Sequence, residues 1–386
     1  MPSNFDFDRP IDRRDGDSLK WNKYAGRDVL PLWVADMDFV APPAVVAALE
    51  RRVAHGCYGY SKPWPGLVDA VLAYLQRRYD WEVAPEWLVW LPGLVTGLNA
   101  ACRAVGGDAL TAIPVYPPFL SAPKLAGRKL QTVPLVLSGD SWGWDFAQMD
   151  AAVTPETRLL LLCHPHNPVG RAWSREELTQ LAEFCRRHDL IVCSDEIHCD
   201  LILDPGRKHI PLAALDADMA QRTITLMAPS KTYNIPGLGC SLAVVPNATL
   251  RRRLEEVMRG IVPDVNVFGL VAAEAAFNDA AEWHDALIQV LRANRDRVEA
   301  VVAGIPGLSM THVEATYLAW IDARSLGVAD PVRFFEDAGV GLSDGADFGA
   351  PGWVRLNFGC PAATLELALQ RIAAACSAAV SSTILK

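Results

Sequence analysis

Residues 223–239 read TITLMAPSKTYNIPGLG and carry a single lysine, Lys231, in a loop rich in Pro and Gly. The first five residues of this stretch form an apolar, β-branched run that predicts a buried strand. A lysine at such a strand end can be partly desolvated, which lowers the pKa of its amine and lets it form a Schiff base with an aldehyde. An ordinary surface lysine is the alternative that this local pattern leaves open.

The sequence on both sides of this loop predicts an α/β fold. Between residues 87 and 245, short apolar runs alternate with longer amphipathic runs, which is typical of strand-helix-strand units around a largely parallel sheet. Ser174, followed three residues later by Glu177, fits a capping box and predicts a helix over residues 174–188. The seven predicted strands are 87–91, 109–115, 129–135, 158–163, 190–194, 223–227 and 241–245.

Beyond residue 247 the pattern becomes helical and then mixed, which indicates a second, smaller α+β domain. A chain of 386 residues has room for two or three domains. We predict a large domain at residues 45–280 and a small domain formed by residues 1–44 and 281–386, joined by continuous helix. The later elements are predicted as helices up to residue 304, β-like runs at 316–321 and 353–358, and an Ala-rich helix from Pro361.

Composition excludes several classes of partner. The formal net charge is -9, from 36 Lys and Arg against 45 Asp and Glu, which disfavours nucleic acid. No run approaches the ~18 apolar residues of a membrane-spanning helix. The chain begins without an apolar signal core and ends without a lipidation motif, so we expect a cytoplasmic protein. The nine cysteines include no C-x-x-C pair and are expected to be reduced and mostly buried.

Asp195 follows the predicted strand 190–194, at the sheet edge where open α/β folds bind ligands. An acid there can pair with a protonated ring nitrogen of a cofactor and keep that ring electron-withdrawing. A helix N-cap is the structural alternative. A metal site built from Asp195, His198, Cys199 and Asp200 is a further alternative, although it would mix hard and soft ligands.

Three more segments carry groups that a cofactor or substrate could use. Asn167 lies in a turn fixed by two prolines and a glycine, so its amide can donate to a phenolic oxygen or only stabilise the turn. Residues 91–98 run from a strand through Gly93 into a helix, whose free N–H groups favour a phosphate, although nucleotide-binding motifs are missing. Arg355 lies within an apolar strand and needs an anion, either a substrate carboxylate or an internal acid.

In their order along the chain, these segments resemble the fold-type I pyridoxal-phosphate enzymes of the class I and II aminotransferase superfamily. The resemblance implies pyridoxal 5'-phosphate as cofactor, an amino acid as substrate, and a homodimer with its active site at the subunit interface. By this resemblance Lys231 would attach the cofactor and act as base, Asp195 would pair with the ring nitrogen, and Tyr116 would stack on the ring. Asn167 and His198 would lie at the ring hydroxyl, and Arg355 would bind the substrate carboxylate. The phosphate would be held by Gly93, Leu94, Val95 and Ser230, and by Tyr60 of the neighbouring subunit.

Residues 31–39, PLWVADMDF, and His198 narrow the resemblance to the MalY/PatB-type cystathionine β-lyases. That group implies a carbon-sulfur β-lyase, which eliminates a thiol from L-cystathionine or a related cysteine S-conjugate and leaves pyruvate and ammonia. In this reaction Lys231 would remove the Cα proton, and either Tyr116 or Lys231 would protonate the leaving sulfur.

Two positions depart from the superfamily pattern, because Ala228 replaces a frequent phosphate-binding serine and Gly239 replaces a frequent phosphate-binding arginine. Backbone amides, Ser230 and Tyr60 would then carry more of the phosphate charge. An aminotransferase shares every step up to proton removal, so the core motifs leave that activity open. A regulatory role through binding another protein is an alternative from a different class.

Overall fold

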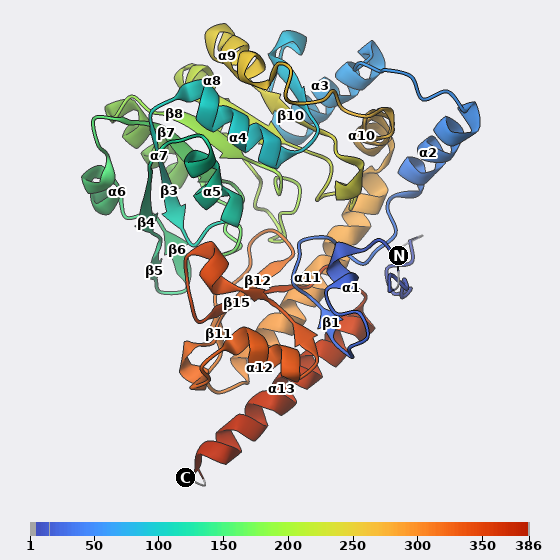
Figure 1. The fold of residues 1–386 in the computed structure, drawn as a ribbon, viewed down its shortest axis with the longest axis vertical. Coiled ribbons are helices and arrows are strands. Elements are labelled where there is room, and N and C mark those ends of the chain that lie inside the picture. Colours follow the sequence, from blue (N-terminus) through green and yellow to red (C-terminus); the bar gives the residue numbers. More distant parts are fainter. Residues whose placement is uncertain (1–4, 15, 385–386) are drawn as a thin grey trace.

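Two sheets organise the protein (Figure 1), whose computed structural model describes residues 5–14 and 16–384. The larger sheet has seven strands in the order β2-β10-β9-β8-β7-β3-β4, and the smaller has four in the order β11-β12-β15-β14. The α/β character predicted from the sequence is confirmed. Expectations about the two chain ends rest partly on residues 1–4 and 385–386, which lie outside the described residues.

All seven predicted strands of the large sheet are present, with ends within two residues of the prediction. Strands β3, β4, β7, β8 and β9 run parallel, while β10 is antiparallel to both β9 and β2. The carboxyl ends of β2, β3, β7, β8 and β9 therefore share one edge. The strands are β2 (Leu88–Leu91), β3 (Asp108–Ile113), β4 (Leu130–Pro134), β7 (Thr157–Cys163), β8 (Ile191–Asp195), β9 (Thr223–Met227) and β10 (Ser241–Val244).

The large sheet is covered on both faces, because side chains of a strand alternate between them. In β7, Leu159 and Leu161 join one apolar cluster, while Leu160 and Leu162 join another. Burying each leucine contributes about 1.5–3 kcal/mol. The first cluster includes α4 (Leu94–Val105), α5 (Pro117–Leu125) and α9 (Ala248–Met258); the second includes α6 (Phe146–Ala152), α7 (Arg175–Arg187) and α8 (Ala217–Arg222). The predicted capping box of α7 is present.

The small antiparallel sheet follows a long helical stretch, as the sequence predicts. Helix α10 (Val267–Asp279) packs on α2 (Pro43–His55) and α3 (Pro65–Tyr79), and α11 (Ala281–Ala303) continues from it toward the small sheet (Figure 1). The predicted domain limits at 45–280 remain a prediction. The other elements here are β11 (Ser309–Met310), β12 (Leu318–Asp322), α12 (Pro331–Asp337), β14 (Ser343–Asp344), β15 (Trp353–Asn357) and α13 (Ala362–Ile384).

The segment of residues 30–39, which we call the N-terminal strap, lies against the small sheet. Its β1 (Leu30–Pro31) pairs in parallel with β13 (Val340–Gly341). The backbone N–H of Asn357 in β15 donates to the Leu32 carbonyl at 2.9 Å. Helix α1 (Leu19–Asn22) precedes the strap, and a separate hairpin joins β5 (Val136–Ser138) to β6 (Ser141–Gly143).

Two further observations concern the chain as a whole. None of the helices in the described part of the chain is long and apolar enough to cross a membrane. All nine cysteines are free thiols, and eight of them are buried, with Cys57 the exposed one. The prediction of mostly buried thiols is therefore confirmed.

Candidate active site

The carboxyl edge of the large sheet brings the predicted site residues of four strands together. Asp195 ends β8, and Lys231 follows the adjacent β9. Asn167 follows β7, which is paired with β8 on its other side. Tyr116 follows β3, and its backbone N–H donates to the Asn167 carbonyl at 3.1 Å. Parallel strand order thus gathers residues that are up to 115 positions apart in the sequence.

Lys231 has an amine suited to act as nucleophile and base. Its Nζ donates a hydrogen bond to the Ala35 carbonyl of the N-terminal strap. Desolvation lowers the pKa of the amine to about 8, although the negative charges of Asp36 and Asp195 act in the opposite direction. A fraction of Lys231 is therefore uncharged near neutral pH, which an ordinary surface lysine is not.

The loop that carries Lys231 is fixed on both sides of the lysine. Thr232 Oγ1 donates to Asp200 Oδ2 at 3.3 Å, and Asp200 also accepts from Tyr79 Oη at 2.5 Å. Asn234 clamps the strap at Met37, because its Oδ1 accepts from the Met37 N–H and its Nδ2 donates to the Met37 carbonyl, both at 2.9 Å. The loop that carries Lys231 and the N-terminal strap therefore hold each other in place.

Asp195 is a buried acid without a cationic partner. Its side chain accepts one hydrogen bond, from the Ile197 N–H at 3.2 Å, and no Lys, Arg or His of the described chain pairs with it. Burial raises the pKa of the carboxyl to about 7. A turn follows Asp195 instead of a helix, so the N-cap alternative is wrong. Such a carboxyl is poised to ionise once a cationic ring nitrogen lies beside it.

Arg355 is a buried cation whose protein partners are all neutral. In β15, its Nη1 donates to Asn167 Oδ1 at 3.0 Å, and its Nη2 donates to the Trp33 carbonyl at 2.9 Å and to Ser343 Oγ at 3.2 Å. Its Nε has no hydrogen-bond partner. Burial lowers the pKa of the guanidinium to about 10. Among the described residues no carboxylate pairs with it, so the internal salt bridge is wrong and an external anion fits.

Three rings line the same region. His198 is buried with an unpartnered Nδ1, and burial, aided by the Lys231 and Arg355 charges, holds its pKa well below the usual range, so the imidazole is neutral. Burial raises the pKa of Tyr116, which keeps its phenol protonated. Tyr317, a residue that sequence reasoning missed, packs 6.0 Å from the His198 ring and donates from Oη to the Ala35 carbonyl at 2.9 Å.

The first turn of α4 offers amides to an anion at this edge. Gly93 occupies the N-cap position without a side-chain cap, and Leu94 and Val95 follow it. Helix dipole and free amides together favour a phosphate. Gly97 lets α4 lie close to β2, because a Cβ there would lie 2.8 Å from Leu91 Cδ1. Ser230, which precedes Lys231, is buried.

At the two positions that depart from the superfamily pattern, the chain offers this anion site neither a cation nor a hydroxyl group. Gly239 has φ +59°, and a Cβ there would lie 3.0 Å from the Pro92 carbonyl oxygen, so a larger residue would be strained. Ala228 is buried and offers no polar side chain. A phosphate bound here would depend on backbone amides, on hydroxyl groups and on groups from outside the chain.

Tyr60 is a predicted site residue that the structure does not join to the others. It is fully exposed on the loop between α2 and α3, and no hydrogen bond joins it to the described site residues. Sequence reasoning also missed Ser343 and Asn357, although Asn357 stands two positions after Arg355 on the same strand face. In residues 5–14 and 16–384 no three His, Cys, Asp or Glu gather as a metal site requires.

Comparison with known proteins identifies the family of this chain. Residues 27–372 match the family described as aminotransferase class I and II. Cystathionine beta-lyase PatB of Bacillus subtilis is 38% identical over 386 residues, an alignment that spans 96% of this chain and 100% of that protein.

Solved structures extend the likeness to the whole fold. The crystal structure of OvoB is 51% identical and has a TM-score of 0.94, covering 96% of this chain and 99% of the other. The PLP-bound C-S lyase from Staphylococcus hominis is 30% identical with a TM-score of 0.90, covering 97% and 98%. The predicted fold class is confirmed. This chain belongs to the aminotransferase class I and II family and, within it, to the group that includes PatB.

Proposed function

We propose that this protein is a carbon-sulfur β-lyase dependent on pyridoxal 5'-phosphate. It converts L-cystathionine or a related cysteine S-conjugate into a thiol, pyruvate and ammonia. The observation that carries the proposal is one site with three groups. A desolvated lysine amine and a buried acid without a paired cation lie at the edge of the large sheet, and a buried arginine without an anion joins them from the small sheet. Relatives such as the cystathionine beta-lyase PatB and the C-S lyase from Staphylococcus hominis support cleavage of a carbon-sulfur bond as the reaction.

The residues present fit the cofactor. Asp195 would hold the protonated ring nitrogen, since its buried carboxyl has no cation of its own. Asn167 would donate from Nδ2 to the ring hydroxyl, because its Oδ1 is occupied by Arg355. The unpartnered His198 would lie beside that hydroxyl, Tyr116 would stack on the ring, and the amides of α4 with Ser230 would hold the phosphate. When bound, the cofactor withdraws electrons from the substrate Cα.

The chain's own residues then divide the elimination among them. Arg355 binds the substrate carboxylate with its free Nε and orients the Cα–H bond. The Lys231 amine takes the Cα proton, the electron pair forms the Cα–Cβ double bond, and the Cβ–S bond breaks as the sulfur leaves with its electron pair. The sulfur takes a proton from the Tyr116 phenol or from Lys231. Hydrolysis of the remaining fragment gives pyruvate and ammonia.

Aminotransfer is the reaction most closely related to this one, and a partition experiment separates the two. We expect L-cystathionine to yield pyruvate at the same rate with and without an added keto acid, because elimination consumes no acceptor for the amino group. Formation of a new amino acid only when a keto acid is present, with no thiol released, would replace the lyase by an aminotransferase. A partner protein that co-purifies with a chain lacking both activities would indicate the regulatory role.

Replacing Arg355 with Gln is expected to raise KM for the amino acid substrate about 100-fold, because a charge-assisted pair with the carboxylate is lost. The effect on kcat should be smaller. Initial rates of pyruvate release against substrate concentration measure both constants. Arg324→Gln, an exposed arginine paired with Asp322, is the matched control. A KM close to that of the parent would remove Arg355 from the carboxylate site.

Tyr60 fits a role that requires a second copy of the chain. Its full exposure, beside the exposed Tyr58 and Val53, would suit an interface in which Tyr60 reaches the phosphate of the neighbouring subunit. We expect a homodimer by light scattering. Tyr60→Phe should weaken cofactor affinity about tenfold, the effect of one lost hydrogen bond to a charged group. Tyr58→Phe is the control, and an unchanged cofactor Kd in Tyr60→Phe would exclude Tyr60 from the phosphate site.

A further inference from the structure

Two carbonyl groups of the N-terminal strap reach into the candidate site. The Trp33 carbonyl accepts from Arg355, and the Ala35 carbonyl accepts from both Lys231 Nζ and Tyr317 Oη. The strap bends between them, because the Asp36 N–H donates to the Val34 carbonyl at 2.9 Å. Backbone atoms of the strap therefore contact Lys231, 196 positions later in the chain, and Arg355, 322 positions later, which are the groups that would deprotonate and bind the substrate.

The carbonyls of Val34 and Asp36, on either side of Ala35, are also held by side-chain donors. Asn357 Nδ2 donates to the Val34 and Asp36 carbonyls at 2.7 Å each. Lys20 Nζ donates to the same Asp36 carbonyl at 3.0 Å. The two peptide groups that flank the one carrying the Ala35 carbonyl are thus fixed, which leaves that carbonyl little freedom to turn away from Lys231.

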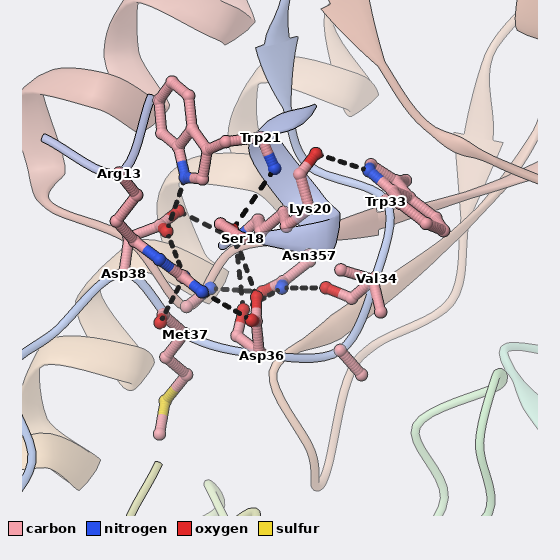
Figure 2. Close-up of polar contacts among 12 residues, drawn as sticks. Arg13, Ser18, Lys20, Trp21, Trp33, Val34, Asp36, Met37, Asp38 and Asn357 are labelled. Carbon is pink, nitrogen blue, oxygen red and sulfur yellow. Dashed lines mark hydrogen bonds and ion pairs between the residues drawn. The ribbon is translucent and has the colours of Figure 1, made fainter. Parts of the chain in front are cut away.

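A compact ionic cluster anchors this part of the strap (Figure 2). Arg13 bridges the two acids, with Nη2 to Asp36 Oδ2 and Nη1 to Asp38 Oδ1 at 2.8 Å each. The fully buried Lys20 pairs with Asp38 Oδ2 at 2.7 Å, and Trp21 Nε1 donates to Asp38 Oδ1 at 3.0 Å. Asp36 Oδ1 is buried, has no hydrogen-bond partner and lies 3.7 Å from Lys20 Nζ.

Folding stability alone does not explain this cluster, because a buried ion pair is often no more stabilising than well-packed apolar side chains. Here the cluster fixes the direction of the Ala35 carbonyl, and it also fixes the position of the negatively charged Asp36 carboxylate. We propose that Asp36, anchored by Arg13 and Lys20, is a positioning residue that makes the Ala35 carbonyl the docking point of the Lys231 amine when that amine is not joined to the cofactor. The inference rests on the proposed role of Lys231 as base.

The charges around the amine determine how the docking point can be tested. Asp195 from β8, Arg355 from β15 and the neutral His198 face Lys231, together with Asp36 from the strap. Asp36→Asn leaves the two cations of the cluster with one acid and is expected to lower the pKa of the amine. Arg13→Gln leaves Asp36 less compensated and is expected to raise it. A cluster whose charges did not reach the Lys231 amine would give no such opposite changes.

The experiment uses the full chain without cofactor. Acetic anhydride acylates only the uncharged amine, so labelling across a pH series, with the Lys231 peptide quantified by mass spectrometry, gives its pKa. At pH 7 we expect about threefold faster acylation in Asp36→Asn and slower acylation in Arg13→Gln. Asp28→Asn, which breaks the exposed pair with Arg371, is the matched control and should not change the rate.

Several outcomes would overturn the inference. Acylation rates that change in the same direction in both variants would indicate only that the strap has become looser. Unchanged rates in both variants would show that Asp36 does not influence the Lys231 amine. If Asp36→Asn fails to fold, Arg13→Gln carries the test, because that guanidinium is partly exposed. In the loaded enzyme kcat should fall about tenfold in Asp36→Asn with KM changed less than twofold, since Arg355 keeps Asn167 and Ser343. Absence of elimination in the parent chain would contradict the proposed function instead.

Discussion

Lys231→Ala is expected to abolish elimination, with kcat lower by on the order of 10⁴-fold or more. The reason is that one side chain supplies two functions. In the proposed mechanism its amine would be the attachment point for the cofactor aldehyde, and the same amine would take the Cα proton. The alanine methyl group can do neither, and no other lysine lies among the residues of the described site. Pyruvate release from L-cystathionine measures the loss.

The control for this variant is Lys124→Ala, which removes an exposed lysine and should keep full activity. Lys231→Ala should still bind the cofactor, because Asp195, Asn167 and the α4 amides remain, but its absorption spectrum should be that of the free aldehyde. Retention of even a tenth of the parent activity would contradict the assignment of Lys231 as base.

Asp195→Asn is expected to lower kcat by about 10³-fold, because the amide has the shape of the carboxyl but cannot stabilise a positive charge on the ring nitrogen. Cofactor affinity should also fall. Reconstitution with a cofactor analogue methylated at that nitrogen, which is permanently cationic, should restore part of the rate. Parent-like turnover in Asp195→Asn would show that the ring charge does not depend on this residue.

The same variant has a testable effect on stability without cofactor. The folded-state pKa of Asp195 is about 7, above the ordinary value of 3.8, so the unfolded chain loses this proton first and stability falls as pH rises between those values. Asparagine does not titrate. Cofactor-free Asp195→Asn should therefore be more stable than the parent at pH 8 by a few kcal/mol and equal to it near pH 4. Urea unfolding at the two pH values measures the difference, and a less stable variant at pH 8 would contradict the buried, unpaired carboxyl.

Local patterns predicted much of this molecule. The seven strands were recognisable because each is a short apolar run that ends at a turn, and α7 was recognisable from Ser174 and Glu177. Asp195, Asn167 and Lys231 could be placed at one edge because parallel strands share their carboxyl ends. These residues also carry side chains with distinctive chemistry, which a sequence displays directly.

The contacts made by the strap could not be predicted in this way. Ala35 and Trp33 act through backbone carbonyls, and a carbonyl has no signature in a sequence. Their alignment depends on Asn357 and on the cluster of Arg13, Lys20 and the two acids, which are brought together by tertiary packing. Tyr60 poses a different problem, since its proposed partner belongs to another copy of the chain.

The central claim is tested most directly by the stoichiometry of one reaction. Purified protein with added pyridoxal 5'-phosphate is incubated with L-cystathionine without any keto acid, and pyruvate and free thiol are measured together. We predict equal amounts of both, formed over many turnovers and lost in Lys231→Ala. Absence of thiol and pyruvate, with transfer of the amino group once a keto acid is added, would contradict β-elimination as the activity of this protein.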